Sequence, residues 1–217
     1  MCQAGYCAGV CVPATTRCSG TTPETCDANG QWQPEAACTG TTPVCRDGAC
    51  VECKPDDVVE VAAGGLHTCA RKGDGTLWCW GENSYGQVGD GMTTDRRSPV
   101  QVTALGSSVV EVAAGYYNTC ARKGDGTLRC WGENNYGLVG DGTTAGGTAC
   151  GPDLTSVCRM SPVQVTALGS SVVEVAVGYY HTCARKSDGT LWWWGLNGNG
   201  QVVDGTTGVD FRNSSSR

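Results

Sequence analysis

Apolar and polar residues alternate at every second position through much of this chain, which is the side-chain period of a β-strand and not the 3.6-residue period of a helix. From Val58 onward the alternation predicts four short strands, separated by glycine-rich breaks and by Pro99. These strands are expected at residues 58–63, 67–71, 76–80 and 100–103. No stretch has a helical period, so the pattern predicts an all-β fold.

The same pattern occurs three times, in copies that begin at Val58, Val109 and Val172. Such a repeat forms one unit that buries its apolar faces only against its neighbours, so we expect the copies to stack. We place them at residues 58–108, 109–171 and 172–211. The second copy is longer because of an insertion between Thr143 and Met160, and the third is incomplete, since F-R-N-S-S-S-R stands where S-P-V-Q-V is expected.

A Gly-Asp-Gly turn at 73–75 closes the two middle strands of the first copy as a hairpin, and the second copy has the same turn. Centring the turn on its aspartate sets Cys69 opposite Cys79 and Cys120 opposite Cys130. Opposed residues at a non-hydrogen-bonded site have Cα atoms about 4.5 to 5.5 Å apart, within the reach of a disulfide. We therefore predict both disulfides, although reduced cysteines packed in the core are an alternative.

The other cysteines of the repeats do not follow this rule. Cys183 in the third copy faces Trp193, so it is either a free thiol or bonded to a distant partner. Cys150 and Cys158 lie eight residues apart within the insertion, and we predict that they staple it.

The cysteine count also bears on the compartment. Sixteen cysteines in 217 residues indicate an oxidising environment, so we expect a secreted or cell-surface protein. The first residues have neither a basic segment nor an apolar segment of a signal peptide, which predicts that the natural amino terminus lies upstream. The net charge of −6 without a Lys/Arg cluster argues against nucleic acid as a partner, and no apolar run is long enough for a membrane span.

Residues 1–54 have a different composition and are predicted to be a separate, disulfide-stapled module before the repeats at 55–217. Nine cysteines stand among Pro, Thr, Gly and Asn, with few aliphatic residues to form a core. Spacing does not determine their connectivity, and the odd number leaves one without a partner in the module. The C-x-x-C pair at Cys50 and Cys53 leaves zinc binding as a less favoured alternative.

The repeats contain no recognisable catalytic set. His67 and His181 occupy one repeat position where the second copy has Asn118, which favours a hydrogen-bonding role over catalysis or metal binding. The Gly-Asp-Gly segments at 89–91 and 140–142 lack the alternating oxygens of a calcium loop and are predicted to be turns. We predict no catalytic, cofactor-binding or metal-binding residues, and no enzymatic activity. A carboxylate-dependent hydrolase would need a non-repeating acidic pair, and the sequence offers none.

Tryptophan positions suggest which face is buried. Trp80, Trp131 and Trp194 are equivalent and are expected in the core, whereas the position two residues earlier holds Trp, Arg or Trp and is expected near the blade margin.

The motifs V-V-x-V-A-A-G, H-T-C-A, D-G-T-L-W-C-W-G-x-N and Y-G-Q-V-G-D-G resemble the regulator of chromosome condensation repeat, in the cysteine-bearing form of secreted bacterial proteins. The resemblance covers about residues 58–207 and implies a β-propeller with one four-stranded blade per repeat. Three blades are too few to close a propeller, so we expect either a fragment or an open stack. The exposed edges of an open stack favour self-association. The first module similarly resembles cysteine-rich spacers of bacterial surface proteins.

These observations favour a non-catalytic extracellular or cell-surface binding or adhesion module, whose propeller-face loops bind a protein or a glycan. The stapled insertion at 143–160 would be its most distinctive loop. Two alternatives remain open. One is a secreted enzyme inhibitor of the β-lactamase-binding propeller type, and the other is a truncated fragment without a function of its own.

Overall fold

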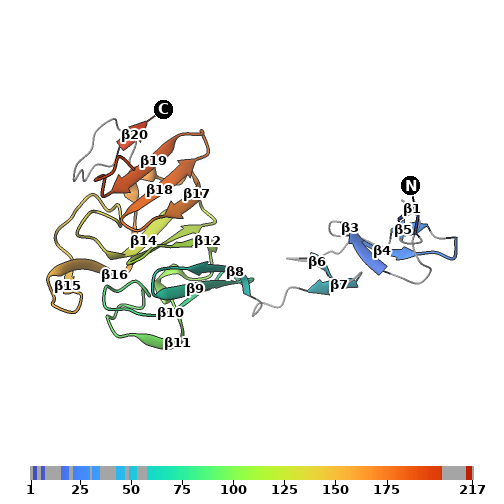
Figure 1. Ribbon diagram of the computed structural model, residues 1–217, viewed down its shortest axis with the longest axis horizontal. Helices are drawn as coiled ribbons and strands as arrows, with labels where there is room; N and C mark the ends of the chain where they lie inside the picture. The colour runs from blue at the N-terminus through green and yellow to red at the C-terminus, as the bar shows by residue number, and fades with distance from the viewer. Residues whose placement is uncertain are drawn as a thin grey trace. The chain divides into compact units, whose positions relative to one another are not determined.

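A computed structural model describes residues 58–201 continuously, together with short backbone stretches at 2–3, 6–7, 16–19, 22–29, 31–34, 43–46, 49–52 and 214–216. The contacts divide the chain into two units, Met1–Asp57 and Val58–Arg217. Regular structure in both is almost entirely β (Figure 1). Within these described stretches, no helix has the length and apolar character needed to cross a membrane.

The first unit consists of short antiparallel sheets. The strands are β1 (Cys2–Gln3), β2 (Tyr6–Cys7), β3 (Thr16–Ser19), β4 (Thr22–Cys26), β5 (Trp32–Pro34), β6 (Pro43–Arg46) and β7 (Ala49–Glu52). Strands β3, β4 and β5 form one sheet, while β1 pairs with β2 and β6 with β7. Cys26 is buried and disulfide-bonded. The connectivity of the other cysteines at 2–53, and the zinc alternative at Cys50 and Cys53, lie outside the described side chains.

The first blade is an antiparallel sheet whose strands follow one another in chain order. They are β8 (Val58–Ala63), β9 (His67–Lys72), β10 (Leu77–Gly81) and β11 (Arg96–Gln101). The hairpin register sets Cys69 opposite Cys79, which confirms the register derived from the Gly-Asp-Gly turn. The predicted position of the fourth strand, residues 100–103, was wrong by several residues, because β11 begins at Arg96 and includes Pro99. An edge strand tolerates proline, since one side of its backbone needs no ladder partner.

The second blade has five strands where four were predicted. Its strands are β12 (Val109–Ala114), β13 (Asn118–Lys123), β14 (Leu128–Glu133), β15 (Thr148–Cys150) and β16 (Ser156–Gln164). The sheet order is β12-β13-β14-β16-β15, so the insertion has added β15 at the outer edge. It has also lengthened β16 to nine residues. Part of the insertion therefore continues the sheet, and the rest forms the loops before and after β15.

The third blade also has a fourth strand, contrary to the expectation of an incomplete copy. Its strands are β17 (Val172–Val177), β18 (His181–Lys186), β19 (Leu191–Gly195) and β20 (Ser214–Ser216). Ser214 pairs with Trp193, just as Val100 pairs with Cys79 in the first blade. The S-P-V-Q-V motif is thus not required for a fourth strand, because ladder bonds use the backbone and any residue with an N–H and a carbonyl can supply them.

The predicted all-β fold is confirmed, and the described repeats add only two short 3₁₀ turns to it. Residues Thr103–Leu105 and Thr166–Leu168 form short 3₁₀ turns, η1 and η2, that connect one blade to the next. Such turns are too short to produce a helical period in the sequence. Each turn buries its leucine, Leu105 or Leu168, at the junction between two blades.

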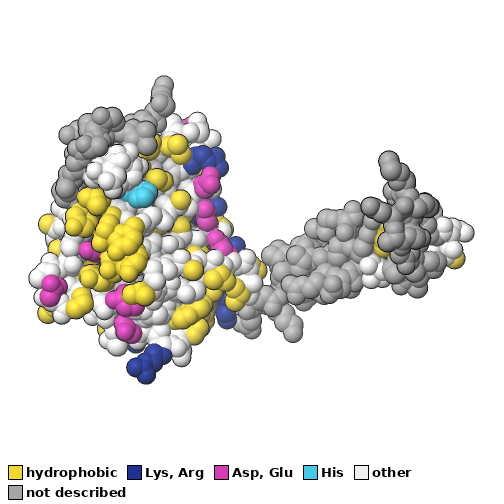
Figure 2. All heavy atoms as spheres, in the orientation of Figure 1, with side chains coloured by type: hydrophobic (Ala, Val, Ile, Leu, Met, Phe, Trp, Pro, Cys, Tyr) yellow, Lys and Arg dark blue, Asp and Glu magenta, His cyan; other side chains and the backbone are white. Residues whose placement is uncertain are grey.

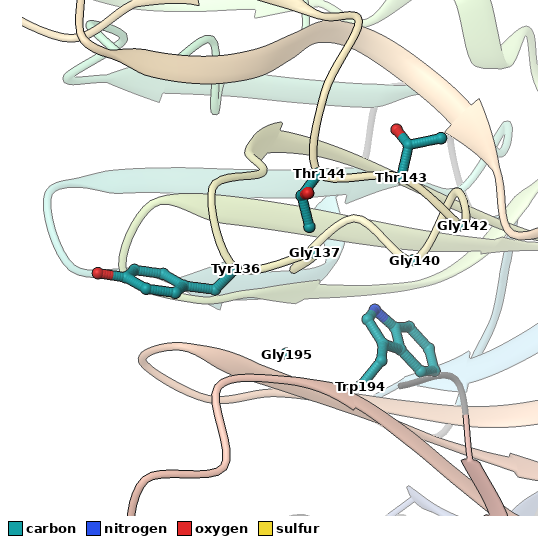
Figure 3. A pocket seen from close by; sticks show the side chains of 8 residues that line it. All are labelled: Tyr136, Gly137, Gly140, Gly142, Thr143, Thr144, Trp194 and Gly195. Atoms are coloured by element: carbon teal, nitrogen blue, oxygen red, sulfur yellow. The ribbon is translucent and has the colours of Figure 1, made fainter. Parts of the chain in front are cut away.

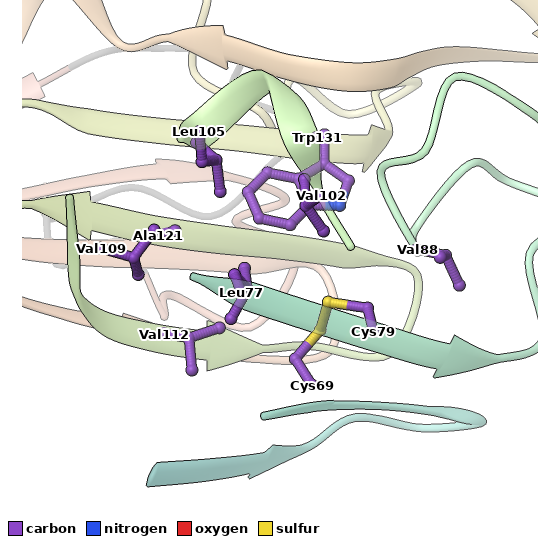
Figure 4. Close-up of a cluster of buried hydrophobic side chains, with 10 residues drawn as sticks. All are labelled: Cys69, Leu77, Cys79, Val88, Val102, Leu105, Val109, Val112, Ala121 and Trp131. Atoms are coloured by element: carbon purple, nitrogen blue, oxygen red, sulfur yellow. A yellow bond between two sulfur atoms is a disulfide. The ribbon is translucent and has the colours of Figure 1, made fainter. Parts of the chain in front are cut away.

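The hydrophobic core lies between adjacent blades. Figure 4 shows Leu77, Val88 and the Cys69–Cys79 disulfide of the first blade packed with residues of the second, including Val112 and Trp131. An equivalent cluster joins the second and third blades. The valines at one repeat position report this coverage: Val112 and Val175 are each 6% exposed, whereas Val61 is 61% exposed. A preceding blade is what covers this valine in the second and third copies.

A shared hydrogen-bond acceptor links each pair of blades. The backbone carbonyl of Gln87 accepts a bond of 2.8 Å from Trp131 Nε1 and one of 2.7 Å from Thr119 Oγ1. The carbonyl of Leu138 does the same for Trp194 Nε1 at 2.8 Å and Thr182 Oγ1 at 3.1 Å. Trp131 and Trp194 are fully buried, which confirms the core role expected for them, whereas Trp80 is half-buried. The position two residues earlier, Trp78, Arg129 or Trp192, is half-buried, as expected for the margin.

The histidine position also joins blades. Thr119 Oγ1 uses its proton on the Gln87 carbonyl, so His67 Nε2 donates to Thr119 Oγ1 across 2.8 Å. In the second blade Asn118 Nδ2 donates to Thr182 Oγ1 at 3.4 Å. The hydrogen-bonding role expected for this position is therefore confirmed in the first and second copies, where the partner is a threonine hydroxyl.

The indoles require glycine in the loop that they meet. Gly140 has a φ of +73°, and a Cβ added there would lie 2.7 Å from Trp194 Nε1 (Figure 3). Gly142 has a similar φ of +84°, but a Cβ there would meet nothing within 4 Å. Alanine substitutions at these two glycines therefore distinguish the free-energy cost of the left-handed backbone conformation from the cost of crowding the indole.

We expect Gly140→Ala to destabilise the blades by about 3 kcal/mol, the sum of a left-handed alanine and an overpacked indole contact. Gly142→Ala should cost only about 1 to 2 kcal/mol, since the conformational term alone applies. Urea unfolding of the two variants and the wild type measures the difference. Equal destabilisation by both substitutions would contradict the role given to the indole contact.

Burial makes the stability of the first junction depend on pH. Desolvation lowers the pKa of His67 from 6.5 to about 4, so the unfolded chain takes up a proton that the folded chain refuses between these values. The contribution of His67 is therefore complete above about pH 6.5 and decreases as the pH falls toward 4, by up to about 3 kcal/mol.

We expect His67→Asn, which copies Asn118, to remove this component of the pH dependence. Thermal unfolding of the wild type and the variant between pH 4 and 7.5 tests it, because the acidic groups titrate alike in both. Parallel stability curves would show that His67 is not held neutral by burial.

Candidate binding surface

Six tyrosines from the three blades gather at one end of the strands, and we call this group the tyrosine cluster. Two come from the β12–β13 turn, two from the β17–β18 turn, and one each from the loops that follow β10 and β14. The members are Tyr85, Tyr116, Tyr117, Tyr136, Tyr179 and Tyr180. They occupy equivalent repeat positions, so stacking the blades brings them together in register.

The rings form a continuous network. Tyr116 stacks on Tyr179 with ring centres 4.2 Å apart and an interplanar angle of 30°. Tyr117 lies 4.5 Å from Tyr85, and Tyr180 lies 5.4 Å from Tyr136. These separations are typical of favourable aromatic pairs.

The first blade has a glycine, Gly65, at the position where the other two blades have a stacked tyrosine. Gly65 stands at the repeat position of Tyr116, and a Cβ on it would lie 2.6 Å from the Tyr116 ring. The Tyr116 ring therefore lies against the backbone of the preceding blade, which holds its orientation.

The tyrosine cluster reaches solvent. Tyr179 is 48% exposed and the other five are half-buried, while Leu66 beside them is 59% exposed. Figure 2 shows hydrophobic side chains in patches on one face of the blades, with acidic side chains between. Rigid tyrosines of this kind supply a large contact area at low cost in conformational entropy.

Acidic groups influence the hydroxyls. Burial raises the pKa of Tyr85, and the charges of Glu133, Glu82 and Asp153 raise it further. Burial and neighbouring tyrosines raise the pKa of Tyr117 to about 12. Burial, Tyr179 and Glu133 raise that of Tyr180. These hydroxyls therefore stay protonated at physiological pH and can donate hydrogen bonds to a ligand.

The insertion lies next to the tyrosine cluster. Its backbone bridges two blades, because the N–H of Gly151 donates to the Ser84 carbonyl at 2.8 Å and the N–H of Gly91 donates to the Met160 carbonyl at 3.0 Å. A Cβ on Gly151 would lie 3.0 Å from the Tyr85 ring. The insertion is thus fixed beside the tyrosines by backbone contacts.

The predicted site residues are the cysteines of the repeats. The structure joins Cys69 to Cys79, Cys120 to Cys130 and Cys150 to Cys158 as disulfides. All six are buried, and they lie within the blades and the insertion. Cys183 is a free, half-buried thiol whose pKa is raised by burial.

One hollow in the second and third blades lacks charged groups. It has a volume of about 140 Å³, lies beside the edge of Trp194 and is lined by the loop glycines Gly137, Gly140 and Gly142 with Thr143 and Thr144 (Figure 3). Its lining carries no charged side chain. Among the described residues, no three His, Cys, Asp or Glu side chains are grouped so that they could hold a metal ion.

The sequence interpretation missed the tyrosine cluster. The available signal was the recurrence of Gly-Tyr-Tyr at 115–117 and 178–180 and of a tyrosine at 85 and 136. That these positions meet across blades follows only from the stacking.

Family models and individual proteins match this chain. A model of the regulator of chromosome condensation (RCC1) repeat matches residues 74–122 and 125–185, and a second model with the same description matches 58–87, 109–138 and 172–201. The ultraviolet-B receptor UVR8 of Arabidopsis thaliana is 38% identical over 144 residues, covering 65% of this chain and 30% of the receptor. The human E3 ubiquitin-protein ligase HERC2 is 30% identical over 195 residues, covering 70% of this chain and 4% of the ligase.

Solved structures show the same fold. Prp20p from Saccharomyces cerevisiae superposes with a TM-score of 0.64 at 22% identity, covering 74% of this chain and 38% of Prp20p. Human WBSCR16 superposes with a TM-score of 0.59 at 21% identity, covering 76% of this chain and 39% of that one. This chain therefore spans less than half of each relative. The repeated motifs, the stacked blades and these matches show that the chain belongs to the RCC1 repeat family and forms part of a β-propeller.

Proposed function

We propose that this chain is a non-catalytic binding module of an extracellular or cell-surface protein, and that it captures a protein or a glycan with the tyrosine-bearing end of its blades. The observation that carries the proposal is the tyrosine cluster itself. Six rings held by backbone and by one another present hydroxyl donors and apolar faces in one place. Tyrosine is enriched in binding hot spots for these reasons.

Two further features support the proposal. The disulfides of the blades and the insertion suit an oxidising compartment, which favours secretion or display at the cell surface. The insertion adds a rigid wall beside Tyr85, which lowers the entropy that a binding loop loses when it meets its ligand. A propeller of RCC1 repeats is, moreover, a scaffold for protein interactions.

We expect Tyr179→Ser to abolish binding that wild-type protein shows on arrays of glycans and of extracellular proteins, because it removes the most exposed ring of the tyrosine cluster. Leu191→Ser is the matched control: Leu191 is 49% exposed, close to the 48% of Tyr179, but lies at the opposite end of the third blade. Ligands that bind both variants as tightly as wild type would show that another surface is responsible.

Opening the staple gives an independent prediction. The double variant Cys150→Ser, Cys158→Ser should weaken binding of the same array ligands by about tenfold, because the insertion would then lose order before binding. Thermal unfolding followed by circular dichroism checks that the blades remain folded. Unchanged affinity in a folded double variant would remove the insertion from the binding surface.

A further inference from the structure

Glu82 and Glu133 occupy the same repeat position, but their carboxylates are satisfied differently. Glu82 Oε2 accepts a hydrogen bond from Gln87 Nε2 in its own blade. The second blade has Leu138 at the position of Gln87, so this donor is missing. Glu133 Oε1 accepts a 3.2 Å bond from Asn135 Nδ2, and its Oε2 has no hydrogen-bond partner.

The unpaired oxygen is buried. Glu133 is only 6% exposed, which makes an unfilled acceptor costly. Burial raises the pKa of Glu133, and the Asn135 hydrogen bond is the one influence that lowers it. Among the described residues, no Lys or Arg side chain forms an ion pair with this carboxylate. Native structures rarely leave a buried group in this state without a reason.

Glu133 lies beside the tyrosine cluster, because its backbone N–H donates to the Tyr117 carbonyl at 3.0 Å. Its negative charge also contributes to the raised pKa values of Tyr85 and Tyr180, two members of the tyrosine cluster from different blades. Tyr117 lies between them, with its ring centre 4.5 Å from Tyr85 and 6.3 Å from Tyr180. Glu82 and Asp153 add further negative charge beside Tyr85.

We propose that the part of the tyrosine cluster around Glu133 binds an organic ammonium group, of the kind carried by lysine, methylated lysine or choline. Tyrosine faces attract such a cation through their quadrupoles, and a poorly hydrated carboxylate beneath them strengthens that attraction. The positive charge of the ammonium stabilises the Glu133 carboxylate, whereas Glu82 is satisfied by a hydrogen bond from the neutral amide of Gln87. This inference rests on the proposed binding role of the tyrosine cluster and names the chemistry of its ligand.

Choline and its uncharged isostere 3,3-dimethylbutan-1-ol provide the test, with binding to the full chain followed by NMR titration. We expect saturable binding of choline and at least tenfold weaker binding of the isostere. Glu133→Gln should weaken choline binding at least tenfold. Leu138→Gln, which copies the first blade and satisfies the free oxygen, should weaken it as well.

Asp125→Asn is the matched control, because it neutralises an exposed carboxylate at the opposite end of the same blade and should leave choline binding unchanged. Circular dichroism and thermal unfolding establish that each variant is folded. Equal affinity for choline and the isostere, or wild-type affinity in folded Glu133→Gln, would overturn the inference. If array binding still depended on Tyr179 in that case, the proposed binding function would stand and only the ammonium inference would be wrong.

Discussion

The carbonyl oxygen that each blade turns toward the next, at Gln87 and again at Leu138, is the interaction on which the stack depends. It accepts one bond from an indole and one from a threonine hydroxyl of the following blade. Both donors are buried, so losing the acceptor would leave two unsatisfied polar groups in the core. The indole can reach the carbonyl only because the loop beyond it has glycine, at Gly89 and Gly140, with no side chain in the way.

The tyrosine cluster is a consequence of this junction. Once the Trp and Thr donors fix the rotation of one blade against the next, the turns after β8, β12 and β17 lie side by side at one end of the strands. Any residue type in those turns is then repeated across the surface. Tyrosines at four of these turn positions, and in the loops after β10 and β14, therefore form one network of rings. The repeat geometry alone brings them together. The binding surface therefore inherits its order from the core.

Much of the fold could be predicted from the sequence because the repeat supplies three versions of the same pattern. The hairpin register of Cys69 and Cys79 follows from the period of two and from the turn between them. The wrong predictions lie where backbone bonding decides without the help of side chains: β20 pairs through Ser214–Ser216, and β15 extends the sheet from the insertion. The candidate site could not be predicted in the same way. Gln87 donates a hydrogen bond to Glu82, whereas Leu138 at the same repeat position leaves Glu133 Oε2 without a donor. This difference depends on which side chains meet in space, and the sequence pattern does not show that.

Differences between the copies carry more functional information than their common residues. Two positions that hold the same residue in all three copies, the indole and the threonine that follows the His or Asn position, form the blade junction in the second and third copies. A position that differs between the copies is not required by the junction to hold one residue type. Gly65 against Tyr116 and Tyr179, and Gln87 against Leu138, change at the exposed end of the blades, and the insertion in the second copy lies beside the same end. Because identical neighbours cannot create a unique site by symmetry, a single ligand can be distinguished only where the symmetry is broken, and in the described blades these breaks converge on Glu133 and the rings around it.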